Sequence, residues 1–410
     1  MSNHTSLDQI KVSLDFGAAT IPVGRLASRD NKVYFEYDSS FLNLDLNISP
    51  FKLPLEPGLS SFDSFLFEGV PGVFNDSLPD GWGRLLLDRI LRGKNLLPSE
   101  FSSLDRLAYV GKAGLGALIY EPDQSEENNN HTIGLDELAD QTKAVLDGEA
   151  EDVLQELMNL NGSSAGARPK ALIGIEKSRK HLIHGSHTLP DRYEHWLVKF
   201  ANAYDGPDAG AIEYVYGLMA IEAGVEMADI HLFPAKKGAG YFATKRFDRN
   251  KGKRLHMHTA SGLLHSDFRT PSLDYENLLA LTEVLTKDVR EVAKMFHLSV
   301  FNVLSHNRDD HGKNFSFLMN DQGEWKLSPA YDLTFSSGPR GEQSTMVLGE
   351  GKKPTVDHLI KLGTNAKIDK KHVHEIIEKT RNALRQWTRL AKDYGVSQSS
   401  IKLIEDRISS

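Results

Sequence analysis

A run of ionisable residues follows an apolar segment in the last third of the chain. Residues 305–314 read S-H-N-R-D-D-H-G-K-N and come directly after the apolar stretch 296–304. Asp309 could accept or orient the proton of an attacking hydroxyl, and Asn314 could reach a magnesium ion beside a transferring phosphate. The same residue types stand five positions apart in the loop H-R-D-x-x-x-x-N of protein kinases. The alternative is a polar surface loop with an Asx turn.

A second carboxylate lies downstream in an apolar setting. Asp332 stands in residues 327–333, L-S-P-A-Y-D-L, and burying such a group is costly unless it is paired or bound to a metal. Its place in the chain fits the further magnesium ligand that kinases carry after the catalytic loop. The alternative is an Asp that begins a helix or a turn.

A lysine ends an apolar segment upstream. Lys199 closes the strand-like run L-V-K, which resembles the V-A-I-K strand whose Lys contacts nucleotide phosphates and a helix Glu. Glu213, in the next predicted helix, is the candidate partner. The alternatives are a Lys that extends into solvent at a strand end and a solvated helix Glu.

Small residues precede the strand-like run 172–175. Residues 162–170 read G-S-S-A-G-A-R-P-K. Small side chains let backbone N–H groups approach phosphate oxygens, and Arg168 and Lys170 supply positive charge. The segment matches neither a Walker loop nor G-x-G-x-x-G, so a flexible linker is the alternative. The order of a phosphate loop, strand Lys, helix Glu, catalytic Asp and Asn, and metal Asp nevertheless favours ATP-dependent phosphoryl transfer.

The surrounding pattern predicts the elements that position these groups. Short alternating runs in residues 9–70 indicate antiparallel strands, and further strands are expected at 172–175, 195–200 and 230–248. Helical spacing is present in residues 81–92, 135–160, 211–224 and, apart from the interval 306–338, from 275 onward. We expect an α+β protein with units at residues 1–125, 132–270 and 271–410, the first boundary being the polar stretch 121–131.

Composition excludes several classes of protein. The 410 residues include no cysteine, so disulfides and Cys–zinc sites are ruled out. A formal net charge of -8 argues against non-specific nucleic-acid binding by the whole molecule. The N-terminus does not resemble a signal peptide, and no apolar run approaches the length of a membrane span. We expect a soluble, cytoplasmic protein without a membrane partner.

Four motifs together resemble one family. Residues 309–316, D-D-H-G-K-N-F-S, and 328–332, S-P-A-Y-D, carry the most specific patterns. Residues 241–249 are similar to an E-R-F-D-R element, and residues 74–83 are similar to an F-x-x-x-L-P-D segment. These motifs resemble the HipA family of bacterial serine/threonine kinase toxins, and the resemblance extends over nearly the whole chain.

The resemblance implies a protein-kinase-like two-lobe fold with an N-terminal β-rich unit. It also implies ATP, magnesium, a protein substrate, and a helix-turn-helix antitoxin that holds the toxin on operator DNA. Asp309 would be the catalytic base, and Asn314 and Asp332 the metal ligands. Autophosphorylation would fall on Ser163, the best match, or on its neighbour Ser164. The implied nucleotide-binding residues are Lys199, Glu213, Lys245, Phe247, His311, Gly166, Ala167, Arg168 and Lys170.

Two departures from the family pattern affect these expectations. Lys245 stands where a Glu is usual, so only its backbone is expected to contact adenine. Pro169 removes one N–H donor from the phosphate loop. A weakly catalytic scaffold that acts through antitoxin and DNA, and a small-molecule kinase, stay open as alternatives.

Overall fold

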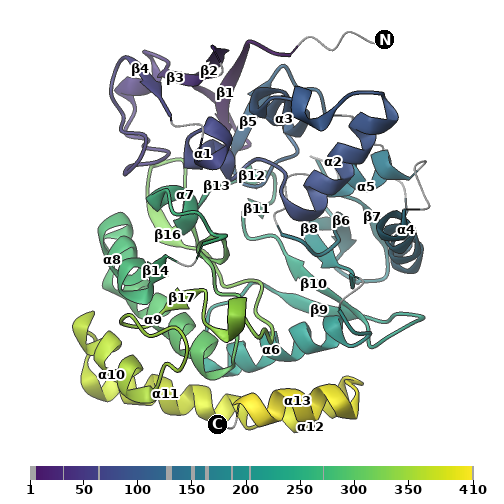
Figure 1. The fold of residues 1–410 in the computed structure, drawn as a ribbon, viewed down its shortest axis with the longest axis vertical. Helices are drawn as coiled ribbons and strands as arrows, with labels where there is room; N and C mark the ends of the chain where they lie inside the picture. The colour runs from purple at the N-terminus through teal and green to yellow at the C-terminus, as the bar shows by residue number, and fades with distance from the viewer. Residues whose placement is uncertain are drawn as a thin grey trace.

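The computed structural model describes residues 6–30, 32–62, 65–125, 132–148, 153–161, 166–185, 188–202, 205–270 and 272–408. Figure 1 shows the N-terminal elements at one end of the long axis and the C-terminal helices at the other. In the described part of the chain no helix is long and apolar enough to cross a membrane.

The first unit is built on an antiparallel sheet of strand order β4-β3-β2-β1-β5. Alternation along β1 places Ile10, Val12 and Leu14 in the core, where a half-buried strand needs its apolar residues. Helices α1 to α3 and the 3-10 turns η1 to η3 also belong to the described part of this unit. The bounds are β1 Gln9–Asp15, β2 Thr20–Arg29, β3 Lys32–Tyr37, η1 Phe41–Asn43, β4 Leu59–Ser61, η2 Phe67–Gly69, α1 Gly72–Asn75, α2 Gly81–Gly93, η3 Pro98–Glu100, α3 Ser103–Val110 and β5 Leu118–Glu121.

A second antiparallel sheet, of strand order β7-β6-β8-β10-β9, carries the central helix α6 (Ala209–Ala223). This helix ends at Gly224, which adopts φ 91°, a left-handed conformation that suits glycine. The helical pattern of residues 135–160 forms two helices, because Gly148 ends the first in a left-handed cap. The remaining bounds are α4 Leu135–Asp147, α5 Leu154–Asn161, β6 Lys170–Glu176, β7 Leu182–His184, β8 Tyr193–Lys199, β9 Ile230–Phe233 and β10 Tyr241–Lys245.

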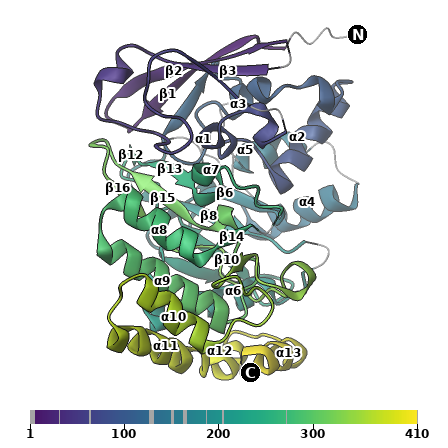
Figure 2. The ribbon, with the colours of Figure 1, turned by 60° about the vertical axis from the view of Figure 1, so that its left-hand side comes forward.

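The third unit is mostly helical and includes a small sheet of order β13-β15-β16. Figure 2 shows α8, α9, α10 and α11 following one another away from the first unit. The strands β11 Arg249–Asn250 and β12 Lys253–Arg254 precede this unit, whose bounds are β13 His256–Thr259, α7 Ala260–Leu264, β14 Leu273–Asp274, α8 Tyr275–Thr286, α9 Val289–Leu304, η4 Gly312–Asn314, β15 Ser316–Met319, β16 Trp325–Leu327, η5 Pro339–Gly341, β17 Thr345–Met346, α10 Val356–Asn365, α11 Lys370–Leu384, α12 Trp387–Asp393 and α13 Gln398–Ile408.

Strand pairing bears on the expected unit boundaries. β13 pairs with β15, so residues 256–259 join the sheet that follows the catalytic loop. We therefore propose that the second unit ends before His256 rather than at residue 270. The expected boundary within 121–131 stays a prediction, since residues 126–131 lie outside the described residues.

A buried histidine at this junction predicts sensitivity to acid. His256 is fully buried in β13, and its Nε2 donates to the Ile48 carbonyl 2.9 Å away, while no described group bonds its Nδ1. Burial lowers the pKa of His256 to about 3. The unfolded chain therefore binds more protons below pH 6.5, and stability falls as the pH drops through that value. At pH 5 the expected loss is about 2 kcal/mol.

Urea unfolding at pH 7.5 and pH 5 measures this loss. His256→Gln keeps a donor for the Ile48 carbonyl and should reduce the pH dependence of the free energy of unfolding. His374→Gln, at an exposed position of α11, should leave that pH dependence unchanged. An unchanged pH dependence in His256→Gln would contradict the assignment.

Candidate active site

The catalytic loop begins where α9 ends at Ser305. The side-chain nitrogen of Asn314 donates to the Asp309 carbonyl 2.7 Å away, and the Asn314 N–H donates to the His311 carbonyl at 2.8 Å. These bonds fold the loop back on itself. Asp309 and Asn314, five positions apart, are therefore held in one compact turn.

Asp309 keeps its carboxylate accessible. Its side chain is 57% exposed, and the Nε2 atom of His311 lies 3.9 Å from its Oδ1. Partial burial and the negative charge of Asp332 raise the pKa of Asp309, against the opposing charges of His311, Arg168 and Lys199. A carboxylate with a raised pKa is a stronger base, as the abstraction of a hydroxyl proton requires.

Asp332 lies in a strained and highly charged position. It adopts φ 58°, a left-handed conformation that Asp tolerates better than most residues. Its Oδ1 accepts a hydrogen bond from Lys199 Nζ at 2.5 Å. Burial alone would raise the pKa of Asp332, but the ammonium groups of Lys199 and Lys170 hold it well below its usual range. Asp332 is therefore an anion at neutral pH.

Lys199 links the sheet, the central helix and Asp332. It closes β8, and its Nζ contacts Glu213 Oε1 of α6 at 2.5 Å as well as Asp332. Glu213 is 2% exposed and also accepts from Arg168 Nη1 at 3.2 Å. The guanidinium of Arg168 contacts Asp205 through Nε at 3.0 Å. The ion pair expected between strand Lys and helix Glu is present, and Arg168 is shared between two carboxylates.

The phosphate loop is only partly described. Ser163 and Ser164 lie outside the described residues, whereas Gly166, Ala167, Arg168 and Lys170 lie within them. The Gly166 N–H donates to Asp80 rather than standing free for a phosphate. Lys170 opens β6, is buried, and lies so close to Gly166 that a Cβ there would meet its Nζ at 2.8 Å. Burial, with the nearby charge of Lys199, lowers the pKa of Lys170 to about 8.

The segment expected to contact adenine includes the end of β10 and the residues that follow it. The Lys245 side chain contacts Glu194 at 2.8 Å, while its N–H donates to the Asp229 carbonyl at 2.8 Å. The Phe247 ring lies 5.6 Å from the ring of Tyr331, the residue before Asp332. Phe247 is therefore next to the metal-site segment, and the nucleotide roles of Lys245 and Phe247 stay predictions.

One buried carboxylate, next to Asp309 in the chain, was not predicted from the sequence. Asp310 is fully buried and accepts hydrogen bonds from Tyr275 at 2.6 Å, Ser344 N–H at 2.9 Å and Gln343 at 3.0 Å. Burial raises the pKa of Asp310 to about 6. Because neighbouring side chains in an extended loop point apart, the pair of adjacent Asp residues was a usable signal that one faces inward. No comparable sequence signal marked Asp205.

These groups fit magnesium and a polyphosphate. The carboxylate of Asp332 and the amide oxygen of Asn314 are hard oxygen donors of the kind that Mg²⁺ binds. The negative charge of Asp332 also acts on the carboxylate of Asp309. Lys199, Lys170 and Arg168 gather positive charge around Asp332. An exposed carboxylate, oxygen donors and cations therefore lie close together in this part of the structure.

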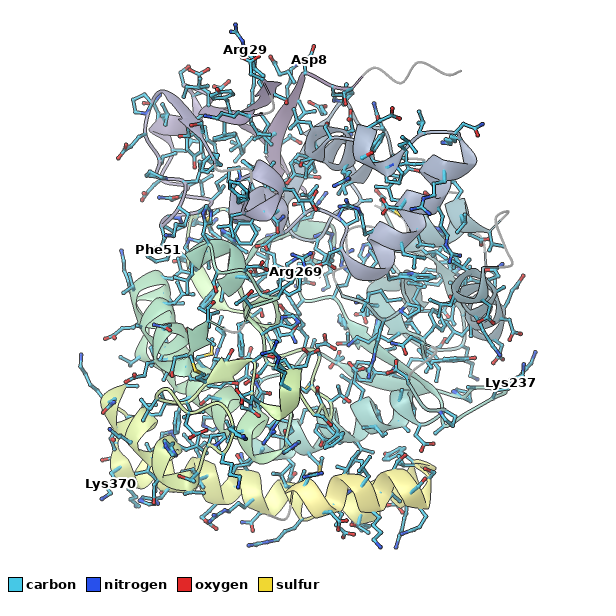
Figure 3. All side chains as sticks on the ribbon, viewed as in Figure 1. Asp8, Arg29, Phe51, Lys237, Arg269 and Lys370 are labelled. Carbon is cyan, nitrogen blue, oxygen red and sulfur yellow. The ribbon has the colours of Figure 1, made fainter. Side chains whose placement is uncertain are left out.

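A separate cavity lies away from this chemistry. Its volume is about 580 Å³, and it lies where the first unit meets α7 and α8, with Phe51, His265 and Val284 among its lining residues. Figure 3 shows Phe51 at that edge of the molecule. Its described lining includes none of the candidate catalytic or nucleotide-binding residues.

Comparison with known proteins identifies the family. The HipA N-terminal domain model matches residues 14–121, and the HipA-like C-terminal domain model matches residues 162–388. Y4mE, a candidate kinase of Sinorhizobium fredii, is 36% identical over 76 residues, 18% of either chain. The serine/threonine-protein kinase toxin HipA of Shewanella oneidensis is 29% identical over 103 residues, 25% of this chain and 22% of that protein. These alignments span about a fifth of the relatives' own lengths.

A solved structure shares the fold over almost the whole chain. It belongs to the complex of HipA, HipB and operator DNA from Shewanella oneidensis MR-1, with a TM-score of 0.69 and 15% identity over 97% of this chain and 95% of that one. The expected α+β, protein-kinase-like fold is thereby confirmed. The HipA-like C-terminal domain model alone matches more than half of the residues of this chain, and the chain therefore belongs to the HipA family.

Proposed function

We propose that this chain is a serine/threonine protein kinase toxin that transfers the γ-phosphate of ATP to a protein hydroxyl. The observation that supports it best is the pair of 2.5 Å contacts from Lys199 Nζ to Glu213 and to Asp332. Kinases need such a Lys–Glu pair and a metal-binding Asp in place at the same time. Its relatives' names, which include a kinase toxin, agree with this proposal.

The residues divide the reaction between them. Asp309 accepts the proton of the attacking hydroxyl, and its exposure leaves room for a protein side chain. Lys199 and Lys170 would hold the phosphates, and Asn314 and Asp332 would hold magnesium. The metal supplies neutralisation of the charge that develops on the transferred phosphoryl group. Phe247 and the backbone of Lys245 would contact the adenine, and His311 lies beside the carboxylate of Asp309.

We further propose that Ser163 or Ser164 is phosphorylated by the chain itself and that this switches the enzyme off. A phosphate adds about -1.5 to -2 charges at neutral pH. It would compete with ATP for Lys170 and Arg168 at the end of the same loop. Arg168 already contacts Glu213 and Asp205, so its capture would also disturb the Lys199–Glu213 pair.

A labelling experiment tests the proposed activity. The purified chain is incubated with γ-phosphate-labelled ATP, with magnesium or with a chelator, and the labelled amino acids are identified. We expect magnesium-dependent label on Ser or Thr of protein. Label on sugars or aminoglycosides from an added panel, with none on protein, would identify a small-molecule kinase. No transfer under any condition would favour a non-catalytic scaffold.

The proposed partners are a helix-turn-helix antitoxin and, through it, operator DNA, in the cytoplasm. The related structure is a HipA, HipB and operator DNA complex. With a net charge of -8, this chain should bind DNA weakly alone. Gel shifts with the neighbouring operator should show little binding by the chain and a supershift with the antitoxin. Tight, salt-sensitive binding by the chain alone would contradict the proposal.

A further inference from the structure

Asp80 contacts the two loops that carry the proposed chemistry. It precedes α2, yet its side chain accepts no hydrogen bond from that helix. Instead, Oδ1 accepts from the Gly166 N–H at 2.5 Å, and Oδ2 accepts from Lys313 Nζ at 2.6 Å. An Asp at a helix start normally accepts from its own first turn. This carboxylate is therefore committed to distant partners, one in the phosphate loop and one in the catalytic loop.

We propose that Asp80 is a positioning residue that holds the phosphate loop against the catalytic loop. The inference rests on the proposed kinase function. It makes the N-terminal unit part of the nucleotide site, although the recognised kinase elements all lie beyond residue 160.

The first turn of α2 holds Gly166 from a second side. The Trp82 N–H donates to the Gly166 carbonyl at 3.0 Å, so both polar groups of Gly166 are bonded to residues of one short segment. Gly81, between the two contacts, adopts φ 47°, and a Cβ there would lie 2.3 Å from the Gly166 oxygen. Since only a residue without Cβ permits this approach, the segment is shaped to receive the loop. The loop cannot leave without breaking both hydrogen bonds.

Charge reinforces the contact on the catalytic-loop side. The side chains of Asp80 and Lys313 are 14% and 7% exposed, so solvent screens their ion pair little. Lys313 Nζ also lies 4.6 Å from the centre of the Phe268 ring. Lys313 directly precedes Asn314, the proposed metal ligand. Removing Asp80 would leave the largely buried ammonium group of Lys313 without this carboxylate, next in the chain to the proposed metal ligand.

The competing explanation is that Asp80 only joins the units. A matched ion pair separates the two explanations. Asp15 in the first unit contacts Arg254 Nη1 at 3.2 Å, and Arg254 belongs to β12. This pair also crosses between units, but it contacts neither the phosphate loop nor the catalytic loop in the described structure. Asp15→Asn therefore measures the effect of weakening the junction alone.

The test compares Asp80→Ala, Asp80→Asn and Asp15→Asn in the full-length chain. Amide hydrogen exchange at Gly166 and magnesium-ATP affinity by calorimetry are measured for each. We expect faster Gly166 exchange and about tenfold or greater loss of affinity in Asp80→Ala, the size expected when a charge-assisted hydrogen bond is lost. Asp80→Asn keeps an acceptor for the Gly166 N–H, so its exchange rate and affinity should lie between those of Asp80→Ala and the unchanged chain. Asp15→Asn should have the exchange rate and the affinity of the unchanged chain.

Two results would overturn the inference. The first is that both Asp80 variants keep the Gly166 exchange rate and the magnesium-ATP affinity of the unchanged chain. The second is that Asp15→Asn shows the same faster exchange and the same loss of affinity as Asp80→Ala. If Asp80→Ala does not fold, Asp80→Asn, which preserves the shape of the side chain, carries the comparison. Gly166 exchange is measured in the nucleotide-free chain and needs no catalysis. A negative result for the role of Asp80 is therefore distinguishable from a negative result for the proposed kinase activity.

Discussion

Asp309→Ala should lower phosphoryl transfer by about 10²- to 10⁴-fold while leaving magnesium-ATP affinity within about twofold of the unchanged chain. The base acts on the attacking hydroxyl and not on the nucleotide. Asp309 also makes no ion pair with Lys199, Lys170 or Arg168 in the described structure, so the phosphate-binding cations keep their partners in the variant. Initial rates of transfer and calorimetric titration measure the two quantities separately.

The control for this variant is Asp321→Ala. Asp321 is exposed in the turn between β15 and β16, so its removal should leave both quantities unchanged. Transfer at the normal rate by Asp309→Ala would show that another group accepts the proton. A large loss of ATP affinity in that variant would place Asp309 among the nucleotide or metal ligands instead.

Asp332→Asn should abolish transfer and also remove most of the dependence of ATP affinity on magnesium. The amide keeps the size of the side chain and tolerates the left-handed φ of 58°, but it lacks the charge that a metal ligand supplies. Lys199 loses one of its two carboxylate partners as well. We expect about tenfold or greater loss of magnesium-ATP affinity and a smaller change for ATP with a chelator.

Asp30→Asn provides the matched control for this second variant. Asp30 also adopts a left-handed conformation, φ 51°, but it is exposed at the end of β2, so the same replacement there should be silent. Equal magnesium-ATP affinities in Asp309→Ala and Asp332→Asn would contradict the different roles assigned to the two carboxylates.

Local sequence patterns predicted most of the elements around the site. The helix ending at Gly224 and the antiparallel strands around 230–248 are where spacing and glycine placed them. Each depends on residues close together in the chain, because periodicity and capping are local effects. The helical pattern of residues 135–160 predicted one continuous helical segment, but the first helix ends at Gly148. The left-handed conformation of Gly148 ends that helix although apolar residues continue at helical spacing on both sides.

Interactions between distant segments were less predictable. Asp205 pairs with Arg168 across 37 residues, and Asp80 contacts Lys313 across 233 residues. A single carboxylate in a polar loop has the same local sequence whether it is solvated or paired, since only the tertiary fold brings its partner near. The Lys199–Glu213 contact was predictable because protein kinases carry the same Lys–Glu pair on a strand and a helix that can be recognised in the sequence. Asp310 was hidden within the motif that drew attention to Asp309.

Intact-protein mass spectrometry of the chain after incubation with magnesium-ATP tests the central claim most directly. We expect one or more added phosphates on the unchanged chain, mapped by peptide sequencing to Ser163 or Ser164, and none on Asp309→Ala treated in parallel. Phosphate added equally to Asp309→Ala would show that Asp309 is not the base. No phosphate on the unchanged chain, with no labelled protein substrate, would contradict the assignment of this site to protein phosphorylation.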